Sequence, residues 1–391
     1  MTSQALRARA EARGGAPSIA RQLQRFRPEI QDAVAVLAAR HERLADLALS
    51  FPALLVALAW PNARFDPRPV IDGAVAGVPL AALARAARLP LWLRKLEPRS
   101  LIAPLPAMPD GGFIAHRIVN HLPAHPAQAQ AWFEAVSLAH RWVDDCFALW
   151  CAREFAAAKD ARQSRRRRRR ANRWRGSVYR LPLLCLWAWY SGRPDTPAGS
   201  LVEMRWHPQM QLGAAWAGAN AWLELVELDL FLGGRKIDDV LVLHEPGLEG
   251  FTFEPLFSRS SIAAEGTAMR NCVRSYGPAL ARDSLRLWSM RKDGARVATL
   301  AVGWPTSDPL PVIEDLKLVG NIEAPPELWW IARRWLHAHD VRGMIARRLP
   351  WNSPVPDRAG WLRLWKPFWL AKGRVPAWLP LGPSSDALRN L

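Results

Sequence analysis

The sequence predicts an α+β protein, with a helical N-terminal domain followed by a smaller C-terminal domain. We expect that smaller domain to hold a helix, a three-stranded antiparallel meander and a Trp-bearing helix. Three observations predict this class. Apolar residues recur every three or four positions between residues 28 and 160, as on the buried stripe of a helix. Asp293-Gly294 stands between two apolar runs, as in a β-hairpin, and Leu316-Lys317-Leu318 alternates as a half-buried strand does.

The predicted organisation follows changes in composition along the chain. In order, we expect a flexible basic arm (1–27), a helical domain (28–160), an Arg-rich basic segment (161–178), a connecting region (179–250), an α+β domain (251–345) and a Pro/Trp-rich C-terminal extension (346–391). The arm is rich in Arg and Ala like a transit peptide, yet it lacks the apolar stretch of a secretory signal.

Helical spacing places the elements of the N-terminal domain. Proline suits the first turn of a helix, and a helix is predicted from Pro28 to about Leu49. A second is predicted from 79 to 89, where Pro90 stops it. A third is predicted to run without a break from Pro126 to about Lys159. Its buried stripe has steps of four and three residues and consists of Trp132, Val136, Ala139, Val143, Cys146 and Trp150.

The C-terminal domain shows strand signals. We expect strands at 285–291 and 296–304, joined by a turn at Lys292-Asp293-Gly294, and a third strand at 312–319. Residues 265–280 are expected to form a helix before the first strand. Pro325 and Pro326 then open a helix that carries Trp329, Trp330 and Trp335.

Composition indicates a globular protein, since half of the residues are apolar and 23% are charged. The four cysteines include no CxxC pair, which fits a reducing compartment, and a cytoplasmic location is expected. The apolar runs 51–60 and 181–190 are each about half of the roughly 20 residues that a membrane-spanning helix needs. The sequence therefore predicts no transmembrane span.

Positive charge is concentrated in one segment. The formal net charge is +18, and residues 162–175 contain nine arginines and no acid. Such a segment attracts polyanions, and we expect nucleic acid to bind it without regard to base sequence. Trp174 could stack on an unpaired base. The candidate contact residues are Arg165, Arg166, Arg167, Arg168, Arg169, Arg170, Arg173, Trp174 and Arg175. The alternatives are an anionic membrane surface and a solvated or autoinhibitory linker.

Cys272 is the principal candidate for chemistry. On a helix, Met269, Cys272, Val273, Tyr276 and Leu280 would share one face, which favours burial of the thiol as a small apolar group. A nucleophilic thiol and a metal ligand are the alternatives. A nucleophile needs a nearby cation, histidine or helix N-terminus to lower its pKa. No histidine lies between His244 and His337, so an imidazole would have to come from far along the chain.

Residues 251–340 resemble the PcfJ-like domain, a family found in bacteria and their mobile elements and named for an accessory protein of conjugative transfer. The resemblance rests on LFSRSSIAAEGTAMRNCVRSY, on VATLAV within the hairpin, and on EDLKLVGN before the Trp-bearing helix. It covers about a quarter of the chain, and biochemical activity in the family is unassigned. The residues that match the family pattern are Glu265, Gly266, Met269, Cys272, Val273, Tyr276, Thr299 and Asn321.

Three departures from the family pattern bear on chemistry. Many relatives have His where this chain has Asn271, Glu where it has Ala301, and Gln where it has Asp315. An amide cannot accept a proton at neutral pH, so the resemblance favours binding over catalysis. The expected polar pocket consists of Glu265, Asn271, Tyr276, Asp315 and Asn321. Whether the protein is an enzyme is left open.

The remaining histidines and cysteines give weaker signals. His116, His121 and His125 have the spacing H-x4-H-x3-H, but Pro123 interrupts a helix there, so we expect solvated loop residues. Cys146 and Cys151 are expected in the core. No metal and no cofactor is predicted. The sequence therefore predicts a PcfJ-like accessory protein that binds nucleic acid and possesses an interaction module for protein partners. The alternative is a cysteine-dependent enzyme centred on Cys272.

Overall fold

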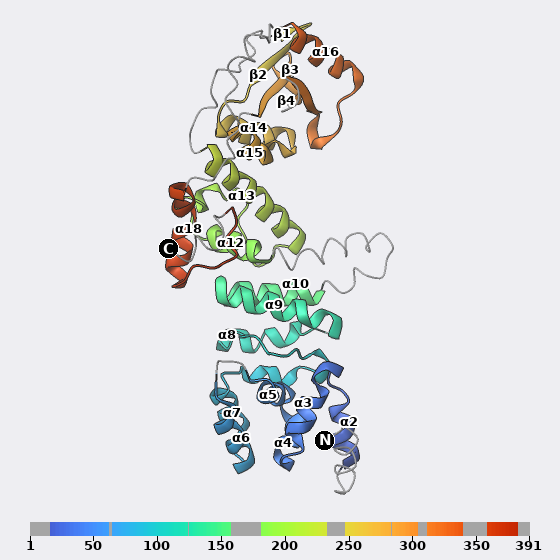
Figure 1. Ribbon diagram of the computed structural model, residues 1–391, viewed down its shortest axis with the longest axis vertical. Helices are drawn as coiled ribbons and strands as arrows, with labels where there is room; N and C mark the ends of the chain where they lie inside the picture. The colour runs from blue at the N-terminus through green and yellow to red at the C-terminus, as the bar shows by residue number, and fades with distance from the viewer. Residues whose placement is uncertain are drawn as a thin grey trace. The chain divides into compact units, whose positions relative to one another are not determined.

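The computed structural model describes residues 16–61, 65–123, 125–157, 181–232, 247–282, 284–303, 311–338 and 358–381 (Figure 1). The chain forms two compact units. The first comprises Met1–Trp189 and Trp206–Ala215, and the second comprises Tyr190–Arg205 and Trp216–Leu391. The Arg-rich segment 161–178 and parts of the basic arm and of the C-terminal extension lie outside the described residues.

The described part of the first unit is helical. Its helices are α2 (Ala16–Leu23), α3 (Pro28–Ala38), α4 (Glu42–Ser50), α5 (Pro52–Ala59), α6 (Pro67–Ala76), α7 (Leu80–Ala86), η1 (Leu91–Lys95), η2 (Pro98–Ser100), α8 (Gly112–Ala115), η3 (Ile118–His121), α9 (Pro126–Trp142) and α10 (Asp145–Ala157). Helix α12 (Leu181–Ser191) ends in the second unit, and α13 (Leu212–Leu232) begins in the first. The predicted helical character of this region is confirmed.

Two predicted helices are broken. The helix expected from Pro28 to about Leu49 is divided into α3 and α4, because His41 is extended and its Nδ1 accepts a hydrogen bond from the Arg43 backbone N–H at 3.2 Å. The helix expected from Pro126 to about Lys159 is divided into α9 and α10. There Asp144 Oδ1 accepts from the Phe147 N–H at 2.8 Å, which caps the new helix.

Indole N–H groups join the helices of the first unit. Trp132 on α9 donates to the Ala152 carbonyl at 3.1 Å, and Trp150 on α10 donates to the Met210 carbonyl at 2.7 Å. Both rings are buried. A buried indole keeps its hydrogen bond while its ring excludes water, so Trp132 links α9 to α10 and Trp150 links α10 to the segment before α13.

The second unit contains the sheet. Its described elements are η6 (Gly199–Leu201), most of α13, β1 (Gly247–Leu248), β2 (Phe251–Pro255), α14 (Arg259–Met269), η8 (Cys272–Tyr276), α15 (Gly277–Ala281), β3 (Leu285–Lys292), β4 (Ala295–Gly303), β5 (Val312–Lys317), η9 (Val319–Asn321), α16 (Pro326–His337) and α18 (Arg358–Lys372). The α+β class is therefore confirmed.

The sheet has five antiparallel strands in the order β1-β2-β3-β4-β5, two more than the predicted meander. Strands β1 and β2 precede α14, where the sequence suggested a helix first. In β2, buried Phe251 and Phe253 alternate with exposed Thr252 and Glu254, which is the period of a half-buried strand. The predicted hairpin is confirmed, since Lys292 pairs with Ala295 around a two-residue turn.

Helices cover both faces of the sheet (Figure 1). On one face, Trp288, Leu300 and Leu316 pack against Trp335 of α16. On the other, Leu287 and Ala301 pack against Val273 and Leu280, from η8 and α15, and against the end of α13. Because both faces of β3 and β4 are covered, most of their side chains are buried and burial does not alternate along these strands.

No helix within the described ranges is long and apolar enough to cross a membrane. The apolar run 181–190 forms α12, and its side chains from Leu184 to Tyr190 are buried.

Candidate functional site

The helix predicted at 265–280 is broken immediately before Cys272. Helix α14 ends at Met269, and Arg270 adopts the left-handed conformation with φ 47°. Asn271 then begins η8, and its Oδ1 accepts a hydrogen bond from the Val273 N–H at 3.4 Å. Cys272 therefore does not share one helical face with Met269 and Leu280. The prediction of a buried, core-filling thiol is wrong, because the Cys272 side chain is partly exposed.

Glu265 forms the centre of a buried polar network beneath this turn. It is 0% exposed, and its carboxylate accepts from Arg296 Nε at 2.8 Å and from Thr299 Oγ1 at 2.8 Å. The Thr299 hydroxyl in turn accepts from Asn271 Nδ2 at 2.8 Å. A buried carboxylate needs such partners, because an unpaired charge is costly away from water. Glu265 and Asn271 thus fasten α14 and η8 to β4.

A second group of polar side chains surrounds the thiol. Cys272 Sγ donates to Asn321 Oδ1 at 3.5 Å, and Tyr276 OH donates to Asp315 Oδ2 at 3.2 Å. Lys317 Nζ lies 3.2 Å from the other oxygen of Asp315 and also pairs with Glu323. Burial raises the pKa of Tyr276, and the neighbouring Asp315 and Cys272 raise it further. The structure therefore brings together Cys272, Tyr276, Asp315 and Asn321, while Glu265 and Asn271 belong to the network beneath.

The side chains that contact the thiol do not supply a base. Within the described residues its polar contacts are the Asn321 amide oxygen and the Tyr276 hydroxyl. Neither group takes up a proton at neutral pH, so neither can generate the thiolate that a nucleophile requires. His337 lies on α16, which covers the other face of the sheet. The described groups around Cys272 are therefore hydrogen-bond donors and acceptors.

A buried arginine that the sequence did not predict lies beside this site. Arg274 is 6% exposed and forms two bonds to the Glu203 carboxylate, at 3.1 and 3.2 Å, and one to the Ala263 carbonyl at 3.1 Å. It also donates to Thr267. A Cβ on Gly266 would lie 2.8 Å from Arg274 Cγ, so glycine is required for this close approach. A glycine inside helix α14, where glycine is unfavourable, was the signal in the sequence that another group packs closely there.

The other candidate residues do not converge. His116 follows α8, His121 belongs to η3 and His125 precedes α9. Burial lowers the pKa of His121, and Arg153 lowers it further. In the part of the chain that the structure describes, no three His, Cys, Asp or Glu residues are placed to hold a metal ion. Cys151 is buried as expected, but the prediction for Cys146 is wrong because it is exposed at the first turn of α10.

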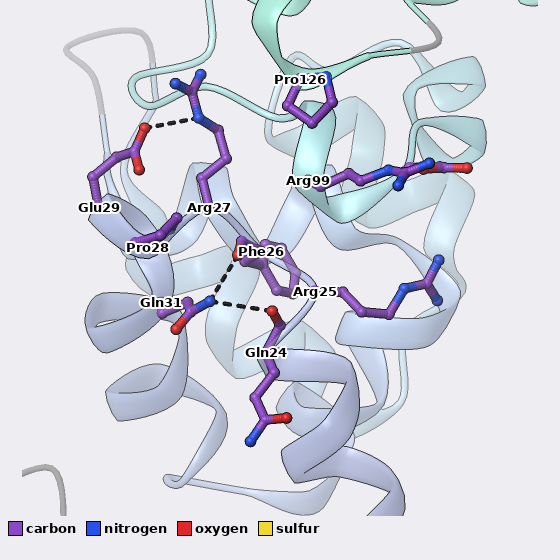
Figure 2. A pocket seen from close by; sticks show the side chains of 10 residues that line it. Gln24, Arg25, Phe26, Arg27, Pro28, Glu29, Gln31, Arg99 and Pro126 are labelled. Carbon is purple, nitrogen blue, oxygen red and sulfur yellow. Dashed lines mark hydrogen bonds and ion pairs between the residues drawn. The ribbon is translucent and has the colours of Figure 1, made fainter.

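The N-terminal unit has an open depression of about 630 Å³, shown in Figure 2. Its arginines are bonded to neighbouring side chains. Arg27 Nε lies 2.7 Å from Glu29, Arg99 Nε lies 2.5 Å from Glu97, and Arg25 donates to Gln22 at 2.8 Å. These contacts neutralise or engage the cations, so the depression offers little attraction for an anion. The residues that line it are Gln24, Arg25, Phe26, Arg27, Pro28, Glu29, Gln31, Glu97, Arg99 and Pro126.

The predicted nucleic-acid contacts from Arg165 to Arg175 lie outside the described residues. Comparison with protein-family models, with curated proteins and with solved structures found no significant match.

Proposed function

We propose that this chain is a PcfJ-like accessory protein that holds nucleic acid through its Arg-rich segment and uses its α+β domain as a binding module. One observation carries the proposal: residues 162–175 contain nine arginines and no acidic residue. Phosphates neutralised by arginine release their counterions, which favours binding of any base sequence. No carboxylate within the segment competes for the guanidinium groups.

The contacts of the α+β domain support binding rather than catalysis. Glu265 and Asn271 are engaged with Thr299, and Asp315 is engaged with Tyr276 and Lys317. These bonds hold the elements of the domain together. Cys272 is partly exposed and Asn321 is exposed, and both side chains can take part in single hydrogen bonds.

Binding of DNA and RNA across a salt series tests the proposal. If about six counterions are released, the slope of log affinity against log salt for duplex DNA is near −5. Changing Arg165–Arg170 to Gln is expected to flatten this slope and weaken binding, whereas changing them to Lys retains the charge and most of the slope. The double variant R27Q/R99Q is a matched control, since both arginines are paired with glutamates and lie outside the segment. Unchanged affinity after removal of the six charges would contradict the proposal.

A cysteine-dependent enzyme is the second candidate, favoured by the partial exposure of Cys272. It requires a thiol of lowered pKa, which reacts with iodoacetamide faster than an ordinary exposed thiol at neutral pH. Cys146, which is exposed, provides the internal comparison. If Cys272 is alkylated more slowly than Cys146, the enzyme hypothesis fails.

Membrane association draws less support from the structure. The argument for it was that the apolar run 181–190 follows the Arg-rich segment. This run forms the buried helix α12. Flotation with liposomes that contain anionic lipid measures how much the Arg-rich segment contributes to membrane binding.

A further inference from the structure

The outer face of α16 presents an exposed tryptophan. Trp330 is 54% exposed, and among the tryptophans that the structure describes it is the one that lies in the exposed class. The others are buried or half-buried, as expected for a large apolar ring. The exposure of Trp330 thus distinguishes it from the other tryptophans in the described part of the chain.

The packing of α16 against the sheet fixes which of its residues face outward. Ile331, Ala332 and Trp335 are buried against the sheet, and the Trp335 ring stacks on Phe253 with centroids 4.2 Å apart. Helical geometry then places Trp330, Arg333 and Arg334 on the opposite side. Rotation of the helix to bury Trp330 would expose Trp335, so the outward position of Trp330 is stable.

Two arginines lie one turn beyond the exposed ring. Arg334 Cζ is 4.4 Å from the centroid of Trp330, and Arg334 also pairs with Glu249. Arg333 Cζ is 5.6 Å from the centroid of Trp329, and within the described residues it has no acidic partner. Trp330, Arg333 and Arg334 together are called the stacking face below. Glu249 engages Arg334, and Glu327, the acid of α16 itself, precedes Trp330 by one turn, so Arg333 supplies the unengaged positive charge of this face among the described residues.

We propose that the stacking face binds single-stranded nucleic acid, with an unpaired base on the Trp330 ring and the adjoining phosphate at Arg333. This inference rests on the proposed function and extends it to a second contact that prefers unpaired bases. Every base has a π face that stacks on an aromatic side chain, so the contact tolerates any sequence. Arginine beside the ring adds a cation for the phosphate and a plane for stacking.

The composition of the stacking face argues against a membrane or a protein as its partner. A membrane surface requires several neighbouring apolar side chains, and a protein hot spot requires an apolar surround that excludes water. Here Trp330 is bordered by Glu327, Arg333 and Arg334. A single ring beside cations suits a base and its phosphate better.

Affinity for labelled oligothymidylate, compared with a duplex of the same length, tests the proposal in the full chain. Trp330→Ala is expected to weaken single-strand binding by at least about fivefold and to leave duplex binding unchanged. Trp330→Phe retains a ring and is expected to restore most of the affinity. Arg333→Gln is expected to reduce the salt slope by about 1.

The matched control uses another exposed ring with an arginine over it. Phe113 is 51% exposed, and Arg117 Cζ lies 4.3 Å from its centroid, but this pair belongs to the first unit. Phe113→Ala is expected to leave binding unchanged. Oligonucleotides that contain iododeoxyuridine provide a direct readout, since irradiation is expected to cross-link them to the peptide that holds Trp330.

The outcomes separate this inference from the proposed function. Suppose that Trp330→Ala binds oligothymidylate as tightly as the unchanged protein while the Arg165–Arg170→Gln variant loses binding. The role proposed for the stacking face is then wrong, and the proposed function stands. The reverse pattern supports the stacking face and contradicts the role of the Arg-rich segment. Equal losses of single-strand and duplex affinity, or a loss of liposome binding in Trp330→Ala, would also overturn the inference.

Discussion

Replacing Gly266 by alanine tests whether the buried Arg274 organises the region around Cys272. An added Cβ would lie 2.8 Å from Arg274 Cγ and 2.9 Å from its Nε. These atoms precede the two terminal nitrogens of the side chain, and Glu203, Ala263 and Thr267 hold those nitrogens. The arginine therefore cannot move aside without losing hydrogen bonds to Glu203, Ala263 and Thr267.

Three contributions set the size of the effect. Overpacking costs about 1–3 kcal/mol, and losing hydrogen bonds to a charged group costs about 1.5–3 kcal/mol. Alanine is favoured over glycine in a helix by about 1 kcal/mol, which offsets part of this loss. The expected net destabilisation is about 1.5–5 kcal/mol.

Urea and thermal unfolding measure this change. For a domain of about 150–250 residues, each kcal/mol lowers Tm by about 2–4 °C. Gly213→Ala is the matched control: it also lies in a helix, α13, but its Cβ would meet nothing within 4 Å. That variant is expected to be neutral or slightly stabilising.

A double-mutant cycle with Arg274→Ala completes the test. Without the arginine side chain the added methyl group has room, so the cost of Gly266→Ala is expected to disappear in that background. If Gly266→Ala is as stable as the unchanged protein, or equally destabilising with and without Arg274, the close packing of these two residues does not govern stability.

Three further predictions follow from other sites. Iodoacetamide is expected to label Cys146 first and Cys272 second, because the first thiol is exposed and the second is partly exposed. Cys151 and Cys185 are buried and are expected to react only after unfolding, which mass spectrometry can show. Burial and then Glu224 raise the pKa of Glu227, so its charge opposes folding above the unfolded-state pKa of about 4.3. Glu227→Gln is therefore expected to raise Tm at neutral pH, with the gain lost as the pH falls below that value; a gain that persists in acid would contradict this cause. Gly294 has φ 78° and open space around it, so Gly294→Ala is expected to cost about 1 kcal/mol in urea unfolding through backbone strain alone, whereas Gly112→Ala should show no such strain.

Local patterns predicted some elements of this fold well. The Asp293-Gly294 turn requires positive φ at both positions, and those residue types adopt it readily, so the hairpin was evident. Helix α16 begins at Pro326 as predicted, because proline suits the first turn. Ile30, Val34 and Leu37 of α3 are buried and recur at helical spacing, the pattern from which a helix starting at Pro28 was predicted.

Periodicity failed where a polar side chain capped a new helix. His41 and Asp144 each accept a backbone N–H, which starts a second helix in a pattern that looked continuous. Arg270 breaks α14 in the same region as the candidate thiol. The apolar spacing persists across such breaks because both pieces bury one face, so spacing alone cannot show them.

The candidate site was partly predictable. The resemblance selected Glu265, Asn271, Tyr276, Asp315 and Asn321, but it could not divide them between the buried network and the surface around Cys272. That division depends on the pairing of β4 with β5, in which Ala301 stands opposite Asp315. Hydrogen-bond partners from different elements then decide which groups remain available.

The sequence by itself determined the concentration of positive charge, the helical N-terminal region and the hairpin, because charge and turn geometry are local properties. Only the tertiary structure decided that Arg274 is buried against Glu203, 71 residues away, and that Trp330 is exposed while Trp335 is covered. Both outcomes depend on which surfaces pack together. A buried charge is stable only where a distant partner satisfies it, and one face of a Trp-rich helix must remain outside when the other covers the sheet.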